Sequence, residues 1–524
     1  MPKVLISDKM SPLAAEVFEN RGIEVDVITD LDKDTLAEKI GEYDGIAIRS
    51  ATKITPKTLA NSRNLKVIGR AGIGVDNVDL KAATGAGIIV MNTPFGNAIT
   101  TAEHAITMML SLARQIPAAN ASTHAGKWEK SRFMGVELMG KTLGIIGCGN
   151  IGAIVADRAQ GLKMKVIAYD PYLSEERAQT LGVEKVTLDE LLPRADFISL
   201  HTPLTEQTRH ILGADALNRT KPGVRVVNCA RGGLVDELAL KAAIESGHVA
   251  GAALDVYAEE PAKDNPLFGM EQVVCTPHLG ASTSEAQEKV AVQVAEQMAD
   301  FLLTGAVTNA LNMASMTAEE APKLKPYMAL AEQLGAFAGQ ATQSAIKEIE
   351  ICYEGDVSTL NTKPLTAIVL KGLLGPLLEG VNMVNAPVIA EDRNIKMLEA
   401  KSETAGNYHT LITVTVTTEN QERSVKGTLF NHEPRIVEIK GIHIDAKLGP
   451  NMLYIANHDK PGLIGALGTV LGKAGVNIAT FNLGRAGEGG DAIALIEIDG
   501  QPPEPVVAQV QGLEHVMHAI PMRF

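Results

Sequence analysis

The chain has 524 residues, of which 45% are hydrophobic, 4% aromatic and 21% charged. This length exceeds one ordinary hydrophobic core and predicts three or four domains of roughly 100 to 200 residues each. The formal charge of −14 argues against a nucleic acid or an anionic membrane as partner, because both require a basic protein face. Forty-eight glycines with few aromatic residues are typical of glycine-rich α/β nucleotide enzymes, not of coiled coils or disordered chains.

The four cysteines predict neither a disulfide framework nor a metal site, since they are widely scattered and form no CxxC pair. The N-terminal sequence MPKVLISDKM enters a strand at once and lacks the long apolar core of a signal peptide. No run of 18 apolar residues follows that could span a membrane. We therefore expect a cytoplasmic protein.

Residues 1–97 alternate short β-branched runs with helical segments, in the order VLISD, EVDVIT, GIAIRS, LKVIGRAG and IIVMNTP. Such alternation predicts a parallel sheet and a first doubly wound, Rossmann-like domain. Thr100 and Glu103 have the spacing of a capping box, which predicts the start of a long inter-domain helix. The apolar stripe of this helix consists of Ala105, Ile106, Met109, Leu112 and Ala113.

A second α/β series occupies residues 98–281 and predicts a doubly wound, Rossmann-like domain. Its six expected strands lie near TLGIIG, KVIAYD, DFISLH, VRVVNCA, GAALDV and VVCTPH. After Gly280, the helix STSEAQEKVAVQVAEQMADFLL leads back to the first domain. The nucleotide domain is therefore expected as an insertion in a substrate domain of residues 1–97 and 282–312, with hinges near 97 and 281.

Two further domains complete the expected α/β architecture. After the linker NMASMTAEEAPKLKP, residues 313–450 predict an α+β intervening domain with strands near IKEIEICYEG, HTLITVTVTT and RIVEIKG. Residues 451–524 have a βαββαβ order, with helices from Pro461 and Pro503, which predicts a small ferredoxin-like regulatory domain.

The sequence GIIGCGNIG contains a GxGxxG motif formed by Gly147, Gly149 and Gly152, between an apolar strand and an amphipathic helix. Glycines at these positions permit a tight turn, close approach to a pyrophosphate and close helix packing, while the helix N-terminus attracts the phosphate charge. Asp170 ends the next strand and is expected to bind the ribose diol and to repel a 2′-phosphate. The pattern predicts NAD as cofactor, whereas a bare GxGxxG can also form a mere tight turn.

The other strands of this domain end in polar or glycine-rich loops, where ligands of open α/β sheets gather. These loops carry Arg231, the pair Glu259 and Glu260, and His278. His278 is suited to accept an alcohol proton as a general base, and Glu260 is suited to raise the pKa of this base. Arg231 is suited to bind a carboxylate through two parallel hydrogen bonds. From composition alone, the same residues also fit ordinary surface charge.

The segments GRAGIGVDNVD, LGIIGCGNIG, HTPLT, NCARGGLVDE, DVYAEEP and TPHLGAST resemble the D-isomer-specific 2-hydroxyacid dehydrogenase family across about the first 312 residues. The resemblance implies that Arg231, Glu260 and His278 form the active site. It implies NAD contacts from Gly147, Gly149, Asn150, Ile151, Gly152, Asp170, Thr202, Cys229, Ala230, Arg231, Asp255, His278 and Gly280.

Three further residues beside these motifs have competing interpretations. Cys229 is interpreted as a cofactor-loop residue and not as a nucleophile. His104 and His201 are possible catalytic groups, yet His104 lies on the apolar-striped helix and is more plausibly a packing or hinge residue.

A phosphorylated substrate requires cations beyond the carboxylate grip, and Arg49 and Arg70 lie at the ends of expected first-domain strands. Ser50 and Gly72 lie beside them, and Arg132 is a third candidate cation. The alternative is that these arginines are ordinary surface residues.

The stretch NHDKPGLIGALGTVLGKAGVNIATFNLGR resembles an ACT domain, a module that binds amino acids. With the intervening segment, the whole chain resembles long family members that oxidise 3-phospho-D-glycerate to 3-phosphohydroxypyruvate, the first committed step of L-serine biosynthesis. The resemblance implies serine as effector, held by Asn457, Asp459, Gly462 and Asn477, and a homotetramer. It also implies that the intervening domain of residues 313–450 is of the allosteric substrate-binding type. The alternative is that this loop forms only a dimer edge.

Arg435, His443 and Lys447 form a weak basic set in the intervening domain, which fits an anion site or ordinary surface solvation equally. Two other functions compete with the phosphoglycerate reading. One is a glycerate, glyoxylate, lactate or 2-hydroxyglutarate dehydrogenase of the same family, and the other is a catalytically silent NAD sensor. The long C-terminal part argues against the first, and the intact Arg231, Glu260 and His278 set argues against the second.

Overall fold

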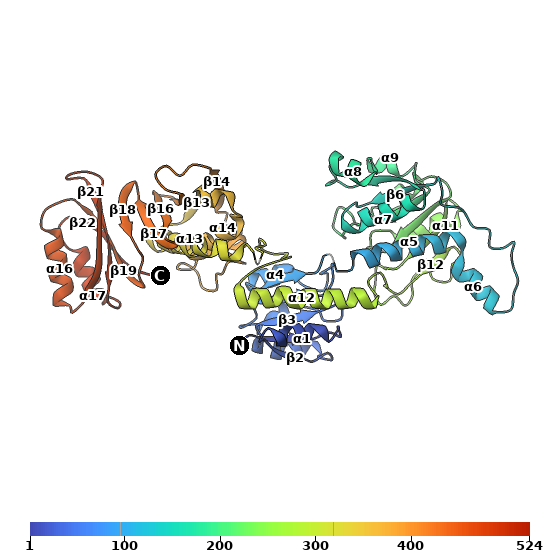
Figure 1. Cartoon of the computed structure of the whole chain (residues 1–524), viewed down its shortest axis with the longest axis horizontal. Coiled ribbons are helices and arrows are strands. Elements are labelled where there is room, and N and C mark those ends of the chain that lie inside the picture. Colours follow the sequence, from blue (N-terminus) through green and yellow to red (C-terminus); the bar gives the residue numbers. More distant parts are fainter. Residues whose placement is uncertain (95, 318) are drawn as a thin grey trace. The chain divides into compact units, whose positions relative to one another are not determined.

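The computed structural model describes residues 1–94, 96–317 and 319–524 (Figure 1). The chain forms two compact units, one of Met1–Asn92 with Val294–Phe524 and the other of Thr93–Gln293. The α/β fold class is confirmed, since parallel sheets with flanking helices occur in both units. Among the described residues, no helix has the length and apolar character needed to cross a membrane.

The N-terminal sheet has five parallel strands in the order β2-β1-β3-β4-β5, as the alternating runs predicted. The strands are β1 (Lys3–Ile6), β2 (Glu24–Val27), β3 (Gly45–Ile48), β4 (Val67–Arg70) and β5 (Ile89–Asn92). The helices between them are α1 (Leu13–Asn20), α2 (Lys33–Lys39), η1 (Ile40–Glu42), α3 (Pro56–Leu59) and α4 (Leu80–Gly85).

The long helix expected after Gly280 is α12 (Ser284–Thr304). Its Met298 packs on the N-terminal sheet so closely that a side chain at Gly69 would meet the Met298 sulfur. The C-terminal half of α12 therefore completes the core of the first sheet, although it follows that sheet by some 200 residues.

The second unit contains a seven-stranded parallel sheet in the order β12-β11-β10-β9-β6-β7-β8. The strands are β6 (Thr142–Ile146), β7 (Lys165–Tyr169), β8 (Glu184–Lys185), β9 (Phe197–Leu200), β10 (Val224–Asn228), β11 (Val249–Leu254) and β12 (Val273–Cys275). The expected count of six strands was wrong, because β8 has two exposed charged residues and no apolar run. The strand order reverses between β6 and β9, where α/β sheets bind ligands.

The helices of this unit are α5 (Ala98–Arg114), α6 (Ile116–His124), α7 (Asn150–Gly161), α8 (Glu175–Leu181), α9 (Leu188–Leu191), α10 (Ala214–Asn218) and α11 (Glu237–Glu245). The expected capping box was wrong: α5 begins at Ala98, after Asn97, and Thr100 already lies inside the helix. Threonine and glutamate three residues apart share one helix face in any turn, so the spacing alone does not fix a helix start.

The intervening sheet has six strands in the order β14-β13-β15-β16-β17-β18, with β13 and β14 parallel and the other pairs antiparallel. The strands are β13 (Ile346–Gly355), β14 (Lys396–Ser402), β15 (Thr410–Thr418), β16 (Glu422–Phe430), β17 (Glu433–Ile439) and β18 (Ile442–Ala446). The remaining elements are α13 (Ala321–Ala341), η2 (Asp356–Thr359), α14 (Lys363–Leu374) and α15 (Ala386–Asp392).

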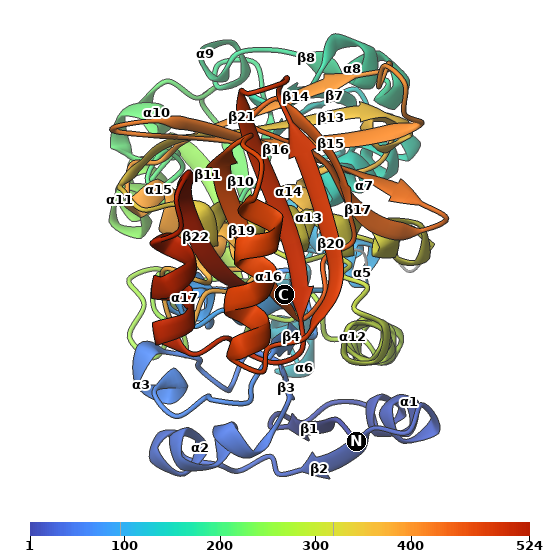
Figure 2. The ribbon, with the colours of Figure 1, turned by 90° about the vertical axis from the view of Figure 1, so that its left-hand side faces the viewer.

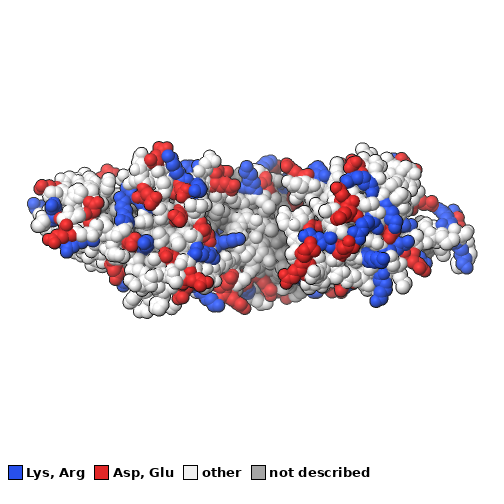
Figure 3. All heavy atoms as spheres, turned by 90° about the horizontal axis from the view of Figure 1, so that it is seen from above, with Lys and Arg blue, Asp and Glu red and all other residues white. Residues whose placement is uncertain are grey.

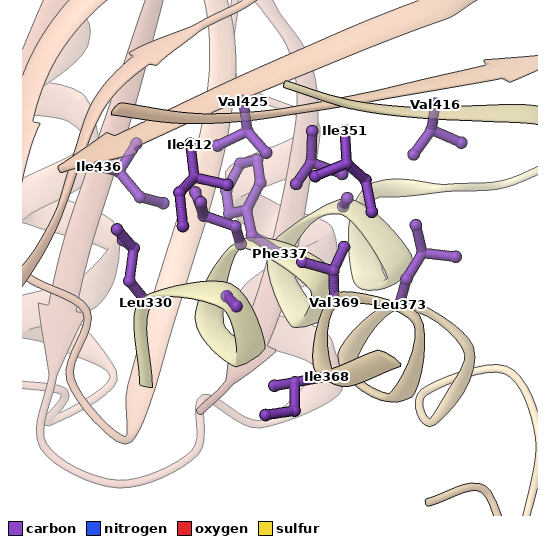
Figure 4. Close-up of a cluster of buried hydrophobic side chains, with 14 of the residues drawn as sticks. Leu330, Phe337, Ile351, Ile368, Val369, Leu373, Ile412, Val416, Val425 and Ile436 are labelled. Carbon is purple, nitrogen blue, oxygen red and sulfur yellow. The ribbon is translucent and has the colours of Figure 1, made fainter. Parts of the chain in front are cut away.

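The core of the intervening domain lies between this sheet and the helices α13 and α14, whose side chains Phe337 and Val369 approach it (Figure 4). The linker expected up to Pro326 is shorter than predicted, since α13 already begins at Ala321. Pro322 is accepted in the first helical turn, where the backbone N–H groups have no intrahelical partner, whereas Pro326 lies inside the helix.

The C-terminal sheet has the order β20-β21-β19-β22 and confirms the ferredoxin-like prediction. The elements are β19 (Asn451–His458), α16 (Leu463–Lys473), β20 (Ile478–Arg485), β21 (Asp491–Ile498), α17 (Glu504–Gln511) and β22 (Val516–Arg523). The helices α16 and α17 lie side by side on one face of the sheet (Figure 2).

Candidate active site

The glycine-rich loop between β6 and α7 has the geometry that a dinucleotide requires. Gly147 has a φ of 93°, and a side chain there would collide with the backbone of His201. A side chain at Gly152 would lie 2.1 Å from the Gly147 carbonyl oxygen, whereas nothing lies within 4 Å of a side chain built at Gly149. Gly147 and Gly152 therefore leave no space for a side chain, whereas Gly149 at the start of α7 borders free space in which a pyrophosphate fits.

Asp170 follows β7 and already supports the glycine-rich loop. Its Oδ2 accepts a hydrogen bond from the Cys148 N–H at 2.8 Å, and its Oδ1 accepts one from the Tyr172 N–H at 2.8 Å. Burial raises the pKa of Cys148 to about 11 and raises that of Cys229 further, so both thiols stay protonated at neutral pH. This state disfavours Cys229 as a nucleophile.

His278 and Glu260 form a direct pair, with 2.6 Å between His278 Nδ1 and Glu260 Oε2. The other carboxylate oxygen of Glu260 accepts the Tyr257 N–H at 3.0 Å, which fixes the carboxylate. The hydrogen bond from Glu260 raises the pKa of His278, while the same bond and the Tyr257 N–H hold the pKa of Glu260 low against the effect of burial. The side chain of His278 remains 52% exposed, so its free Nε2 side is accessible to a substrate.

Asp255 organises the loop that carries His278, a role that the sequence analysis missed. Its side chain is fully buried and accepts hydrogen bonds from Thr276 Oγ1 (2.6 Å), Leu279 N (2.7 Å) and Gly280 N (2.8 Å). His278 itself has a φ of 55°, and its N–H donates to the Asp255 carbonyl oxygen at 2.9 Å. A left-handed residue of this kind persists only where its surroundings fix it, as Asp255 does here.

The loop that carries Arg231 is held against the segment that leads to Glu260. Asn228 Nδ2 donates to the Arg231 carbonyl oxygen at 2.9 Å, and a side chain at Gly232 would lie 1.7 Å from the Tyr257 carbonyl oxygen. The charge of Arg231 also acts on His278 and lowers its pKa slightly against the effect of Glu260. Arg231, Glu260 and His278 are therefore brought to one place.

We expect Gly232→Ala to reduce kcat/KM at least tenfold, because the added methyl group must push the Arg231 loop away from the Tyr257 backbone. Gly161→Ala is the matched control: Gly161 lies in the same unit and is not in the left-handed region, and nothing lies within 4 Å of its added methyl group. Steady-state rates and melting temperatures of both variants check the prediction. Equal rates for the two variants would show that this close approach does not position Arg231.

The two other histidines beside the motifs have structural environments. His104 Nε2 lies 3.3 Å from Thr276 Oγ1 and 3.3 Å from Asp255 Oδ1, within the network that supports the His278 loop. His201 is partly buried, its Nε2 lies 2.8 Å from Ser199 Oγ, and desolvation of its ring lowers its pKa to about 4. His201 is thus neutral near pH 7, and the geometry favours a packing role for it.

The candidate substrate cations differ in their surroundings. Arg49 lies after β3, where its N–H donates to Asp8 Oδ2 at 2.6 Å and its Nη1 to the Lys9 carbonyl oxygen at 3.2 Å. Arg70 ends β4, and a side chain at Gly72 would collide with its guanidinium, so Gly72 leaves the space that Arg70 occupies. Ser50 is exposed after Arg49.

Arg132 lies in the other unit, and its guanidinium pairs with Glu129 and Glu271. These two ion pairs fit the alternative that Arg132 is an ordinary surface arginine. It makes Arg132 a weaker candidate than Arg49 and Arg70 for a phosphate contact.

The expected effector residues lie around the start of α16. Asp459 Oδ2 accepts a hydrogen bond from Arg485 Nη1 at 3.1 Å, and sequence reasoning missed this partner. Gly462 precedes the helix with a φ of 96°. Asn477 Nδ2 donates to Asp499 Oδ2 at 2.8 Å. Asn457 is buried, and its Oδ1 has no hydrogen-bond partner among residues 1–94, 96–317 and 319–524.

The weak basic set of the intervening domain is matched by carboxylates. Arg435 pairs with Asp445 at 3.1 Å, and Lys447 pairs with Glu433 at 3.1 Å. His443 Nδ1 lies 3.9 Å from Glu438. Basic and acidic side chains are also interspersed over the face of the molecule seen in Figure 3.

Comparison with known families defines the class of protein. Residues 106–280 match the model of the NAD binding domain of D-isomer specific 2-hydroxyacid dehydrogenases. Residues 323–440 match the D-3-phosphoglycerate dehydrogenase intervening domain, and residues 452–515 match the ACT domain. The chain is thus an NAD-dependent oxidoreductase with a C-terminal ACT domain.

Relatives that match over their full length identify the family within this class of oxidoreductases. The D-3-phosphoglycerate dehydrogenase of Methanocaldococcus jannaschii is 43% identical over 98% of this chain and 98% of its own. That of Bacillus subtilis is 42% identical over 99% of this chain and 98% of its own. The chain belongs to the D-3-phosphoglycerate dehydrogenase family.

Several solved structures match more than half of the chain. A glyoxylate reductase from Paecilomyes thermophila has a TM-score of 0.56 and 31% identity, and it covers 59% of this chain and 98% of its own. A D-2-hydroxyisocaproate dehydrogenase has a TM-score of 0.54 and 29% identity over 59% of this chain and 99% of its own. Each of these two enzymes is thus matched over almost its whole length by about three fifths of this chain.

Proposed function

We propose that the chain oxidises 3-phospho-D-glycerate to 3-phosphohydroxypyruvate with NAD, the first committed step of L-serine biosynthesis. The observation that carries this proposal is the direct pair of His278 and Glu260 in a chain that matches full-length D-3-phosphoglycerate dehydrogenases from end to end. The competing readings as a glyoxylate or lactate dehydrogenase are less favoured, because the solved structures of such enzymes match only 59% of the chain.

In the proposed reaction, Arg231 binds the substrate carboxylate through its two-pronged guanidinium. His278 Nε2 takes the proton of the 2-hydroxyl group, and Glu260 stabilises the resulting imidazolium through Nδ1. The glycine-rich loop between β6 and α7 would hold NAD, which would supply the acceptor for the hydride of the 2-carbon.

The remaining site residues have roles in binding. Arg49 and Arg70, with Ser50 and Gly72 beside them, are the proposed phosphate site, and Arg132 stays a weaker third candidate. The NAD site comprises Gly147, Gly149, Asn150, Ile151, Gly152, Asp170, Thr202, Cys229, Ala230, Arg231, Asp255, His278 and Gly280.

The proposed domains are a substrate domain of residues 1–97 and 282–312, a nucleotide domain of residues 98–281, an intervening domain of residues 313–450 and an ACT domain of residues 451–524. The ACT domain is consistent with serine feedback, with serine held by Asn457, Asp459, Gly462 and Asn477. A cytoplasmic homotetramer is the proposed working form.

The test is the initial rate of NADH formation with purified protein and NAD, with 3-phosphoglycerate beside unphosphorylated glycerate and with serine in half of the samples. We expect turnover to require the phosphate and to fall when serine is present. Preference for glycerate would overturn the substrate, whereas phosphate-dependent turnover without a serine effect would overturn only the effector site.

We expect Asp170→Ala to reduce the preference for NAD over NADP at least tenfold, because the carboxylate that binds the ribose diol and repels a 2′-phosphate is lost. The ratio of kcat/KM for the two cofactors measures this preference. Asp157→Ala, an exposed acid on α7, is the control and should leave the ratio unchanged. An unchanged ratio in Asp170→Ala would show that another group selects the cofactor.

A further inference from the structure

The loop of residues 49–52 follows β3 directly and carries Arg49 and Ser50, two residues of the proposed phosphate site. Asp8 comes shortly after β1, which pairs with β3 in the first sheet. The carboxyl ends of parallel strands meet at one edge of a sheet, so the segment after β1 lies beside the loop after β3. Asp8 is only 4% exposed, and its carboxylate is therefore unavailable to a substrate.

The carboxylate of Asp8 accepts hydrogen bonds from both ends of this loop. Its Oδ2 accepts one from the Arg49 N–H at 2.6 Å. Its Oδ1 accepts one from the Thr52 N–H at 3.1 Å and one from the Thr52 hydroxyl at 2.7 Å. The Thr52 hydroxyl also lies 2.9 Å from the Ser7 hydroxyl. All partners of the Asp8 side chain are donors, so the loop uses both carboxylate oxygens, whereas an amide at this position would offer only one acceptor oxygen.

Asn77 holds the same loop through its carbonyl groups. Its Nδ2 donates to the Arg49 carbonyl oxygen at 2.7 Å and to the Thr52 carbonyl oxygen at 2.6 Å. The backbone of Asn77 is fixed as well, because its carbonyl oxygen accepts a hydrogen bond from the Ile54 N–H at 2.8 Å. Asp8 and Asn77 thus satisfy the N–H and C=O groups of the same two residues, one at each end of the loop.

The donors between these two ends are not used by the protein. In the described part of the chain, the N–H groups of Ser50 and Ala51 donate to no protein acceptor. The guanidinium of Arg49 donates from Nη1 to the Lys9 carbonyl oxygen at 3.2 Å and forms no ion pair with a described residue. A guanidinium beside backbone N–H groups offers the kind of donors that a phosphate group accepts.

We propose that Asp8 and Asn77 are positioning residues for substrate specificity. By fixing the loop of residues 49–52, they hold Arg49 where it distinguishes a phosphorylated hydroxy acid from an unphosphorylated one. This inference rests on the proposed function, since it takes Arg49 as a ligand of the substrate phosphate. Both residues act through Arg49, and neither contacts the substrate.

Steady-state kinetics of the full chain with 3-phosphoglycerate and with unphosphorylated glycerate test the proposal. We expect Asp8→Asn to lower the ratio of kcat/KM for the two acids at least tenfold, because an oxygen that accepts a loop donor becomes an NH2 donor. The loss should appear as a higher KM for 3-phosphoglycerate, with kcat and the KM for NAD within about twofold of wild type. Asn77→Asp removes both hydrogen bonds to the loop carbonyls and should lower the ratio in the same way.

Two matched controls lie elsewhere in the first sheet and its helices. Asp44→Asn changes a carboxylate that accepts the Lys3 N–H at 2.9 Å before β3, and Asn61→Asp changes an amide that donates to a backbone carbonyl at 3.1 Å. Both should keep the wild-type ratio of kcat/KM, even where they lower the melting temperature. In an Arg49→Gln background, Asp8→Asn should change the ratio less than about twofold, because Asp8 acts through Arg49.

The possible outcomes separate this inference from the proposed function. If wild type prefers 3-phosphoglycerate and both Asp8→Asn and Asn77→Asp retain that preference, the inference is wrong and the proposed substrate stands. If wild type has no such preference, the proposed substrate fails and the inference fails with it. Equal losses of kcat/KM on both acids, together with a lower melting temperature, would show that Asp8 only stabilises the fold.

Discussion

Replacing His278 with glutamine is expected to lower kcat by a factor of about 100 to 10,000, the usual contribution of a positioned general base. Glutamine retains hydrogen-bonding groups near Glu260 but does not take up the hydroxyl proton at neutral pH. NADH binding should remain close to wild type, since the glycine-rich loop between β6 and α7 is untouched. Stopped-flow single turnovers and NADH fluorescence titration measure the two quantities separately.

His210→Gln is a suitable control for this variant. His210 lies in the same unit, is about half exposed, has a φ of 52°, and faces Asp236 at 3.9 Å. His210 therefore has the same backbone conformation as His278 and an acidic neighbour, but it lies outside the candidate site. Undiminished turnover in His278→Gln, or equal losses in both variants, would show that His278 is not the base.

Replacing Glu260 with glutamine should change the pH dependence as well as the rate. The carboxylate raises the pKa of His278 above its ordinary value of about 6.5, and the oxidation requires the neutral imidazole as base. In wild type, the acid limb of kcat/KM for oxidation should therefore lie above pH 6.5. In Glu260→Gln this limb should move to lower pH, because the group that favours the imidazolium is removed.

The rate of the reverse reaction should change with pH in the opposite direction. Reduction of the keto acid requires the imidazolium, so its rate is lost as the pH rises through the raised pKa of His278. In Glu260→Gln this loss should begin at lower pH, and the maximal rate should fall about ten- to a hundredfold because the imidazolium is less stabilised. Rates measured from pH 5 to 10 in both directions determine the two limbs.

Glu259→Gln removes the neighbouring carboxylate and is the control for Glu260→Gln. Its pH profile should match wild type, since the bond to His278 Nδ1 comes from Glu260. An acid limb that stays in place in Glu260→Gln, or one that shifts equally in Glu259→Gln, would contradict the pairing as the cause.

Most of the local structure followed from the sequence. The β-branched runs of residues 1–97 became β1 to β5, and the βαββαβ order of the C-terminal part became the ferredoxin-like sheet. The GxGxxG spacing placed the glycine-rich loop at the strand reversal between β6 and β9. These features depend on side-chain periodicity and glycine conformation, which are properties of short segments.

The elements that sequence reasoning missed carry weak local signals. The strand β8 consists of Glu184 and Lys185, which have no apolar pattern. The start of α5 at Ala98 was masked by a capping-box spacing that also fits the helix interior. The start of α13 was masked by prolines that usually indicate a linker.

By itself, the sequence determined the residue types of the candidate site and the strands that carry them: Arg231, Glu260 and His278 follow successive strands of one parallel sheet. Only the tertiary structure decided that Glu260 contacts Nδ1 of His278, that buried Asp255 fixes the His278 loop, and that Gly232 must be small because the Tyr257 backbone passes beside it. Such contacts join residues far apart in the chain, and their geometry depends on the path of the whole backbone and not on any local pattern.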